Sequence, residues 1–187
     1  MELLNPLIEY DKQLLLYLHS KGSLTWDAFW IFITNPLHWI WLVFVIYIFG
    51  FKIFGFKKTT AISVFIALSG ITSLWFVNGI KNLVQRLRPI NDTSINDSLR
   101  VLIEQNDFSF VSGHSTLSFT ITFLSFWVLK KHYKHAYIFF LFPILFAYSR
   151  IYLAVHYPID IVVGMVLGFI MALLFYKLIN FFVLKNE

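Results

Sequence analysis

The sequence predicts an all-α integral membrane protein: a helical bundle of about five transmembrane helices, preceded by an interfacial amphipathic helix. Two observations predict this fold class. Of the 187 residues, 58% are hydrophobic and only 13% are charged, whereas soluble domains carry about 25% charged residues. The apolar residues are also gathered into long runs. We expect one domain over residues 1–187, with the interfacial helix in 1–24 and the bundle in 25–184.

The first segment, residues 2–20, combines many leucines with charged and polar side chains. The polar residues are Glu9, Asp11, Lys12 and Gln13. This mixture is typical of a helix that lies in the membrane interface and does not cross the bilayer. A short helix packed against the bundle is the alternative interpretation.

Five later segments are apolar enough to span a bilayer, which takes about 20 helical residues. They are residues 26–51, 59–80, 116–129, 136–153 and 159–184. The third segment is short, and we expect its helix to begin at Ser112 or Gly113. Tryptophans and tyrosines near the segment edges are typical of anchors at the membrane interface.

The lysines predict the orientation of the spans. Two loops carry lysines and no acidic residue: the loop after the first span, with Lys52, Lys57 and Lys58, and the loop after the third, with Lys130, Lys131 and Lys134. Positively charged loops stay in the cytoplasm. The N-terminal segment, the loop 81–112 and the turn 154–158 then share the other side. We therefore expect a cytoplasmic (inner) membrane protein whose polar motifs face the periplasmic or extracellular side.

Composition also limits the possible functions. The chain has no cysteine, which excludes disulfides, thiol nucleophiles and thiolate metal sites. The net charge of +5 does not predict nucleic-acid binding, because the basic residues lie at span ends, where topology and anionic lipids account for them. Membrane lipids are the expected partners, and no obligatory protein partner is predicted.

The first polar cluster follows the second span. Lys81 and Arg88 are seven residues apart, two helical turns, and so share one helix face, while Pro89 is expected to end the helix. An arginine fork grips two phosphate oxygens and a lysine adds a point charge, so the pair predicts a phosphate clamp. An ordinary basic span end is the alternative, but positive charge is disfavoured on the translocated side. Arg86 projects from another face and is not expected to contact a substrate.

The second cluster, Ser112-Gly113-His114, stands at the start of the third span. Ser112 suits a helix N-cap, and Gly113 lets the backbone approach an anion closely. The free amides of a helix start attract anions, and His114 could then donate a proton to a leaving oxygen. A capped helix with an interfacial histidine is the alternative.

The third cluster runs from Ser149 and Arg150 to His156 and Asp160. Arg150 near a span end indicates function, because ionisable residues are rare there. A carboxylate four residues after His156 can bind one ring nitrogen and make the other a better base or nucleophile. A favourable charge on a helix N-terminus is the alternative for Asp160. No metal site is predicted, because histidines flanked by cations repel a divalent ion.

Together, the three clusters resemble the signature of the type-2 phosphatidic acid phosphatase and vanadium haloperoxidase superfamily. Its first motif, Lys, six residues and Arg-Pro, is matched by Lys81, Arg88 and Pro89. Its second, Pro-Ser-Gly-His, is matched except that Val111 replaces proline. Its third, Ser-Arg, five residues, His, three residues and Asp, is matched in full. The resemblance covers roughly residues 25–180.

The resemblance implies a metal-independent lipid phosphate or diphosphate phosphatase that needs no cofactor. It implies that His156 attacks phosphorus to form a phosphohistidine, that Asp160 orients it, and that His114 protonates the leaving oxygen. The implied phosphate ligands are Lys81, Arg88, Arg150, Ser112 and Gly113. The bundle 25–184 would then be the catalytic part of the chain, acting at the outer membrane face.

The short chain is most similar in plan to undecaprenyl-diphosphate phosphatases, so that substrate is expected first. Lipid A, phosphatidylglycerophosphate and phosphatidic acid are the alternatives, and the loop 90–109 is expected to shape headgroup choice. Two other classes are less favoured. A haloperoxidase is usually soluble, unlike this chain, and a non-catalytic lipid-binding protein would not need His114, His156 and Asp160 together.

Overall fold

The computed structural model describes residues 5–185, and every regular element within this range is helical. The expected all-α class is therefore confirmed for the described residues. The six α-helices are α1 (Asn5–Ser20), α2 (Leu24–Ile33), α3 (Ile40–Val84), α4 (Gly113–Leu129), α5 (Leu141–Tyr152) and α6 (Pro158–Phe182). Short 3₁₀ turns lie between them: η2 (Pro36–Trp39), η3 (Pro89–Asn91), η4 (Asn96–Ser98) and η5 (Ala136–Phe140).

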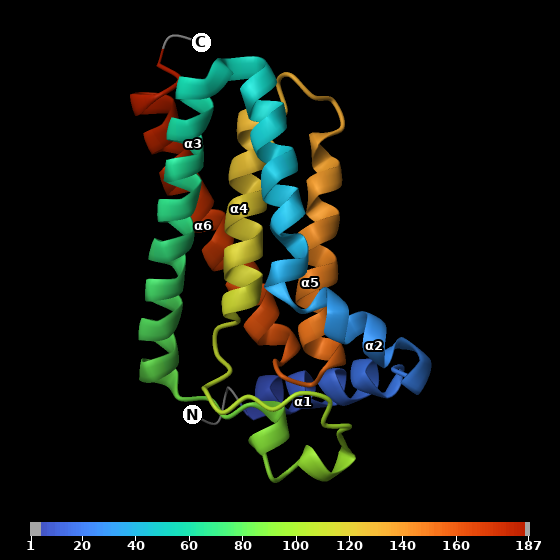
Figure 1. The fold of residues 1–187 in the computed structure, drawn as a ribbon. Helices are drawn as coiled ribbons and strands as arrows, with labels where there is room; N and C mark the ends of the chain where they lie inside the picture. Colours follow the sequence, from blue (N-terminus) through green and yellow to red (C-terminus); the bar gives the residue numbers. More distant parts are fainter. Residues whose placement is uncertain (1–4, 186–187) are drawn as a thin grey trace.

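Helix α3 is two antiparallel arms rather than one rod. Gly55 has φ 71° and ψ 178°, a conformation that side chains other than glycine rarely adopt. At this residue the chain turns back on itself, so that the two arms run side by side (Figure 1). The arms correspond to the first two predicted spans.

The first predicted span, 26–51, was wrong as a continuous helix. Its first part belongs to α2. The helix is then interrupted at Asn35 and Pro36, and α3 begins at Ile40. The break is built into the sequence, because Pro36 cannot continue the preceding helix and the Asn35 side chain instead accepts a hydrogen bond from Leu37 N at 3.0 Å.

Two stretches of the described residues are long and apolar enough to cross a membrane, Pro36–Asn91 and Pro158–Phe182. The first contains both arms of α3. Leu24–Ile33 and Ala136–Tyr152 are shorter apolar helices. The expected total of about five spans remains a prediction.

Two glycines on α6 allow it to lie directly against α4. A Cβ atom on Gly164 would come within 2.8 Å of the Ser112 carbonyl oxygen, and one on Gly168 within 2.6 Å of the Thr116 carbonyl oxygen. Such small residues four apart let the backbones of membrane helices approach closely. The contact brings the starts of both helices together, and Ser112 N donates to Asp160 O at 3.2 Å.

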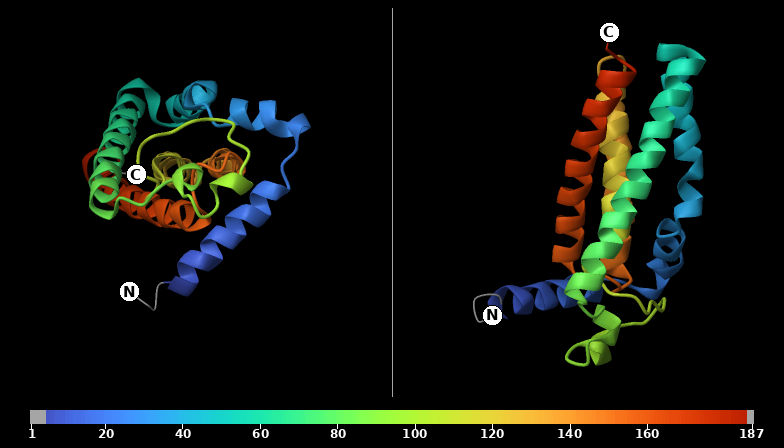
Figure 2. Two further views of the ribbon diagram at one scale, coloured as in Figure 1. Left: turned by 90° about the horizontal axis from the view of Figure 1, so that it is seen from below. Right: turned by 90° about the vertical axis from the view of Figure 1, so that its left-hand side faces the viewer.

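Helix α1 lies across one end of the bundle (Figures 1 and 2). It buries the stripe formed by Asp11, Leu15 and His19, which are spaced one helical turn apart, and it leaves Tyr10 and Tyr17 exposed. The helix therefore packs on the bundle through a stripe with two polar residues. Its location in the membrane interface remains a prediction, and residues 1–4 lie outside the described range.

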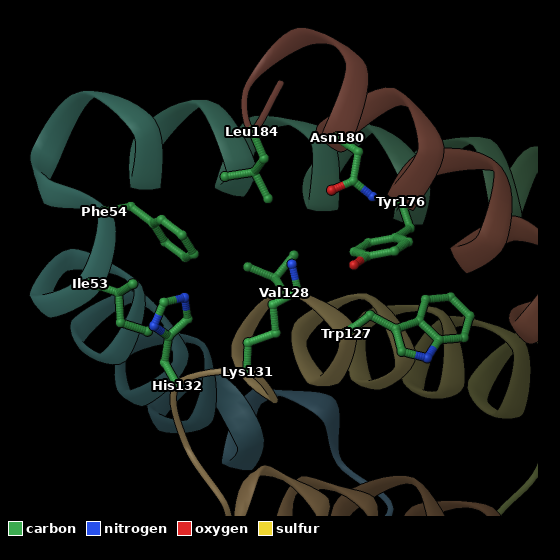
Figure 3. A pocket seen from close by; sticks show the side chains of 9 residues that line it. All are labelled: Ile53, Phe54, Trp127, Val128, Lys131, His132, Tyr176, Asn180 and Leu184. Atoms are coloured by element: carbon green, nitrogen blue, oxygen red, sulfur yellow. The ribbon is translucent and has the colours of Figure 1, made fainter. Parts of the chain in front are cut away.

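The two ends of the bundle carry different segments. Helix α1, the loop between α3 and α4 and the turn between α5 and α6 lie at one end (Figure 1). The turn at Gly55, the loop after α4 and the last turn of α6 lie at the other end (Figure 1). That far end holds a cavity of about 390 Å³ whose lining includes Trp127, Lys131, His132 and Tyr176 (Figure 3).

Candidate active site

The three polar clusters meet around a cavity of about 330 Å³ at the α1 end of the bundle. Five of the predicted site residues line it: Lys81, Arg88, Gly113, His114 and His156. Leu74, Leu117 and Phe146 supply apolar wall. The other three, Ser112, Arg150 and Asp160, lie buried behind the lining.

Lys81 and Arg88 reach the cavity by a different route from the one the sequence predicts. Helix α3 ends at Val84, where Gln85 adopts a left-handed conformation with φ 51° and ψ 34°, so the expectation that the helix continues to Arg88 was wrong. Arg88 is extended, with ψ 154°, as is usual for a residue before proline. Lys81 therefore reaches the cavity from α3, and Arg88 reaches it from the non-helical segment that follows α3.

A carboxylate that the sequence analysis did not single out joins these two cations. Lys81 Nζ lies 2.5 Å from Asp107 Oδ2, and Arg88 Nη2 lies 2.6 Å from Asp107 Oδ1. Burial opposes ionisation of Asp107, but the hydrogen bonds and charges of Lys81 and Arg88 lower its pKa to about 2. Each carboxylate oxygen of Asp107 thus binds one of the two cations. The sequence signal that could have indicated Asp107 is its position as an acidic residue shortly before the second motif.

Arg150 approaches the same loop from α5. Its side chain is buried; Nη2 donates to Gln105 Oε1 at 3.0 Å and Nη1 donates to Thr34 Oγ1. Its Nε has no hydrogen-bond partner among the described residues. Gln105 lines the cavity, so an amide oxygen stands between Arg150 and the space where an anion would bind.

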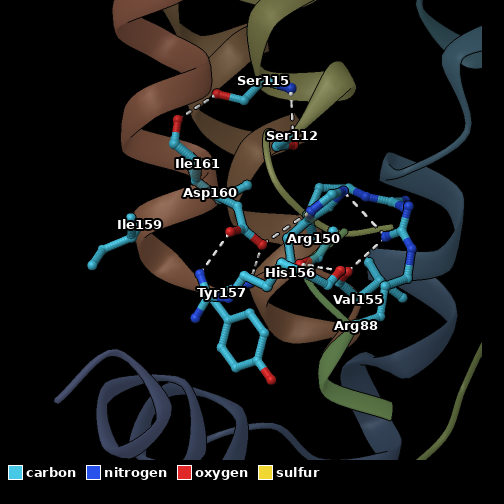
Figure 4. A network of polar contacts seen from close by, with 12 residues as sticks. Arg88, Ser112, Ser115, Arg150, Val155, His156, Tyr157, Ile159, Asp160 and Ile161 are labelled. Atoms are coloured by element: carbon cyan, nitrogen blue, oxygen red, sulfur yellow. Dashed lines mark hydrogen bonds and ion pairs between the residues drawn. The ribbon is translucent and has the colours of Figure 1, made fainter. Parts of the chain in front are cut away.

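The two ring nitrogens of His156 have different partners in the polar network of Figure 4. Its Nδ1 lies 3.4 Å from Asp160 Oδ2, and its Nε2 lies 3.2 Å from Arg88 Nη1. Since a guanidinium can only donate, Nε2 must accept, and the ring proton therefore belongs on Nδ1, facing Asp160. Burial, followed by the charges of Arg88, Arg150 and Lys81, lowers the pKa of His156. The result is a neutral imidazole whose unprotonated Nε2 accepts a hydrogen bond from Arg88.

The start of α4 has the predicted form. Ser112 is the N-cap, and its side chain accepts from Ser115 N at 3.3 Å. Gly113 and His114 follow in the first turn, where His114 packs against the Phe146 ring with a centroid separation of 5.1 Å. Val111, which replaces the motif proline, is fully buried. His114, in the first turn of α4, and His156, in the turn between α5 and α6, thus line one cavity.

Arg86 is the functional candidate that the sequence analysis set aside. Its Nη1 lies 2.8 Å from Asp160 Oδ1, and its Nη2 lies 2.7 Å from Asp11 Oδ2. The guanidinium also lies over the Tyr157 ring, 3.7 Å from its centroid. Arg86 is absent from the cavity lining, as expected, but helical spacing is not the reason, because α3 has already ended at Val84. Arg86 contacts the partner of His156, not the cavity.

Comparison with known proteins agrees with these motifs. The profile of the family described as the PAP2 superfamily matches residues 58–183. A lipid A 4'-phosphatase of Bacteroides thetaiotaomicron is 30% identical over 174 residues, covering 91% of this chain and 77% of that protein. An undecaprenyl-diphosphatase of Sulfolobus acidocaldarius is 28% identical over 120 residues, covering 60% of this chain and 53% of that protein.

The fold has a similar counterpart among solved structures. The PAP2-type phosphatidylglycerolphosphate phosphatase of Bacillus subtilis superposes with a TM-score of 0.73 at 25% identity. The alignment covers 98% of this chain and 89% of that one. The predicted family and the helical architecture therefore agree with both kinds of comparison.

Proposed function

The chain belongs to the PAP2 superfamily of lipid phosphatases, and we propose that it hydrolyses a lipid phosphate through a phosphohistidine on His156. One observation carries the proposal. Two cations from one motif bind a single oxyanion, the Asp107 carboxylate, and one of them, Arg88, also contacts Nε2 of His156. A phosphate that replaced this carboxylate would lie beside an unprotonated imidazole nitrogen.

The bond changes follow from this arrangement. Nε2 of His156 attacks phosphorus, a P–N bond forms, and the P–O bond to the leaving group breaks. His114 gives its proton to the leaving oxygen, and Asp160 stabilises the positive ring of the phosphohistidine through Nδ1. Water then attacks phosphorus and gives a proton to His114, the P–N bond breaks, and inorganic phosphate and free His156 are released. Lys81, Arg88 and Arg150 neutralise charge on the phosphate oxygens, helped by Ser112 and the Gly113 amide.

No metal or cofactor is part of the proposal, because the three cations already supply the charge that a metal would contribute. Within residues 5–185, no group of three or more His, Asp or Glu side chains is arranged to hold a metal ion. Metal independence is open to a direct test with a chelator, which is included in the assay below.

A lipid substrate fits the apolar surroundings of the site. Leu74 and Leu117 line the catalytic cavity and also line a second cavity of about 340 Å³. The walls of that second cavity are mostly apolar, with Val43, Ile66 and Ile121 among them. A phosphate held by Lys81 and Arg88 could thus carry a hydrocarbon tail that stays next to the helices.

Lipid A is the substrate that the comparisons favour most. The matches to two lipid A 4'-phosphatases, from Bacteroides thetaiotaomicron and Porphyromonas gingivalis, each cover 91% of this chain. The match to an undecaprenyl-diphosphatase covers 60%. Undecaprenyl diphosphate, the first expectation from sequence, is therefore proposed second, and phosphatidylglycerophosphate and phosphatidic acid follow.

Phosphate release by the detergent-purified protein in EDTA tests the proposal. The panel is lipid A, undecaprenyl diphosphate, phosphatidylglycerophosphate and phosphatidic acid, each measured beside His156→Ala. Release from one lipid that the variant loses would support the reaction and identify the substrate. A folded protein that releases phosphate from none of them would contradict it, and release that requires added metal would contradict the metal-free mechanism.

The proposed orientation has its own test. The site is proposed to face the periplasmic or extracellular side, and the absence of cysteine makes single introduced cysteines clean probes. We expect a membrane-impermeant maleimide to label Ser98→Cys in intact cells and Lys134→Cys only after the cells are opened. The reverse pattern would place the site in the cytoplasm.

A further inference from the structure

Arg86 bridges two buried carboxylates that come from opposite ends of the sequence. The side chains of Asp11 and Asp160 are 1% and 0% exposed, whereas that of Arg86 is 20% exposed. Each terminal nitrogen of the guanidinium contacts one carboxylate, at 2.7 Å and 2.8 Å respectively. Charged pairs with this geometry are the strong ones among side-chain interactions.

The contact fixes the carboxylate that orients His156. Asp160 Oδ2 accepts from Tyr157 N at 3.0 Å and lies 3.4 Å from His156 Nδ1. Asp160 Oδ1 is held by Arg86. Because its two oxygens have partners on different sides, the carboxylate cannot rotate without breaking a contact. Arg86 therefore sets the angle at which Asp160 meets the imidazole.

Asp11 in turn fixes Arg86 and the start of α6. Its Oδ2 holds Arg86, and its Oδ1 accepts from Ile159 N at 2.9 Å. Ile159 directly precedes Asp160. The Asp11 carboxylate therefore holds both Arg86 and the backbone next to Asp160. Burial raises the pKa of Asp11, while the Ile159 N–H and Arg86 act against that rise.

Arg86 is not arranged as another phosphate ligand. It lines a different cavity, together with Leu7, Ile8 and Tyr157, and is absent from the lining of the catalytic cavity. Both of its terminal nitrogens already bind carboxylates, and its flat face is covered by the Tyr157 ring. Its influence on the reaction must therefore pass through Asp160.

We propose that Arg86 and Asp11 are positioning residues for the pair formed by Asp160 and His156, and that helix α1 is thereby part of the catalytic machinery. The inference rests on the proposed function, since it deepens the account of the same nucleophile. It assigns a role to a helix that lies outside the matched family region, which begins at residue 58.

The charges predict an unusual pattern in the variants. Without Arg86, the carboxylates of Asp11 and Asp160 face each other in a buried space with no cation between them. Removing the charge of Asp11 should then relieve the repulsion. Asp11→Asn should be harmful in the wild-type background and beneficial in an Arg86→Gln background.

The test is a single-turnover assay on the full-length protein with whichever lipid the panel identifies. Base-quenched phosphohistidine is measured against time, giving a rate constant and an amplitude, and steady-state phosphate release by the same variants gives KM. The variants are Arg86→Gln, Arg86→Lys, Asp11→Asn and the double variant Asp11→Asn with Arg86→Gln. The matched control is Arg100→Gln. Arg100 also pairs with a carboxylate, since its Nη1 lies 2.9 Å from Asp27 Oδ1 and 2.8 Å from Asp27 Oδ2, but neither residue lines the catalytic cavity.

A positioning role and a purely structural role differ in what they change. We expect Arg86→Gln to lower the rate constant about 100-fold with the amplitude and KM retained, since small misplacements of a reacting group have effects of that size. Arg86→Lys should recover about tenfold, and the double variant should exceed Arg86→Gln. Arg100→Gln should keep the wild-type rate constant.

Three outcomes would overturn the inference. A reduced amplitude with an unchanged rate constant in Arg86→Gln would show that the residue only supports folding. A raised KM with an unchanged rate constant would make it a substrate ligand. Equal losses in Arg86→Gln and Arg100→Gln would show no special link to Asp160. A wild-type protein that forms no phosphohistidine would instead refute the proposed function, and this inference would fall with it.

Discussion

The α1 end of the bundle buries the charged and histidine side chains of Lys81, Arg88, Arg150, His156 and Asp160. The far end instead exposes its lysines, which are Lys52, Lys57, Lys130, Lys131 and Lys134. The far end is held by an apolar cluster that includes Ile62, Leu124, Val128 and Ile179. One end therefore buries charge in paired contacts, and the other buries apolar and aromatic side chains.

This difference separates function from stability. Buried charges are costly unless they are paired, and removing one partner leaves the other uncompensated. Such an arrangement is specific about geometry, which suits the binding of an anion beside a nucleophile. Packing at the far end is less directional and tolerates exchange of one apolar residue for another. Changes at the first end should alter the reaction, and changes at the second should alter the stability.

His156→Ala should give the largest effect. It removes the proposed nucleophile, and we expect phosphate release to fall by about 10⁴-fold or more. The ring is 1% exposed, so circular dichroism and the melting temperature should be measured on the same sample. A variant that stays folded and retains more than a tenth of the wild-type rate would remove His156 from the role of nucleophile.

Arg88→Ala should come next, with Lys81→Ala close to it. Each removes a cation from the proposed phosphate site, and loss of one such contact costs about 10²- to 10³-fold in kcat/KM. Arg88 should matter more, because it also contacts His156 Nε2 and Val155 O. Steady-state kinetics on the identified lipid provide the measurement, and wild-type kinetics in either variant would exclude that residue from the clamp.

Leu124→Ala should destabilise the far end without changing the site. Leu124 is fully buried in the apolar cluster, and truncating such a leucine costs about 2–5 kcal/mol of unfolding free energy. Denaturant unfolding in detergent measures this loss. The rate constant of phosphohistidine formation should stay at the wild-type value, and a slower rate per active site would show that the two ends are not separable.

Asp107→Asn should have a smaller effect, in the opposite direction. The Asp107 carboxylate binds the two cations that the substrate needs. Replacing it with a neutral amide should therefore lower KM by roughly threefold to tenfold, the range expected for an exposed ion pair. The pKa of Asp107 is depressed to about 2, so in the folded enzyme the competing carboxylate stays charged until the pH falls toward 2. The difference between variant and wild type should therefore be constant from pH 5 to 8, which KM measurements across that range would check.

Lys131→Gln should have the smallest effect. Lys131 is exposed at the far end, beside the cavity of Figure 3, and removing an exposed charge usually changes stability by less than about 0.5 kcal/mol. Activity and melting temperature should both remain close to wild type. A clear loss of activity would show that the far end contributes to the reaction after all.

Much of this protein could be predicted from local patterns in its sequence. Hydropathy indicates the helical membrane architecture, because apolar runs of span length are a property of single segments. The order and spacing of three motifs indicate the family and which residues gather around the cavity. The N-cap at Ser112 could be predicted as well, since capping depends only on neighbouring residues.

The tertiary structure decided what depends on contacts between distant segments. Helix α3 turns at Gly55 and ends at Val84, so helical spacing cannot give the partners of Arg86, which follows the helix. Its partners, Asp11 and Asp160, lie 75 and 74 residues away along the chain. Asp107 meets Lys81 across a sequence separation of 26 positions. The sequence by itself determined which chemical groups are present and which segments are helical, while folding determined which carboxylate neutralises which cation, because that pairing is fixed by burial and geometry across the whole bundle.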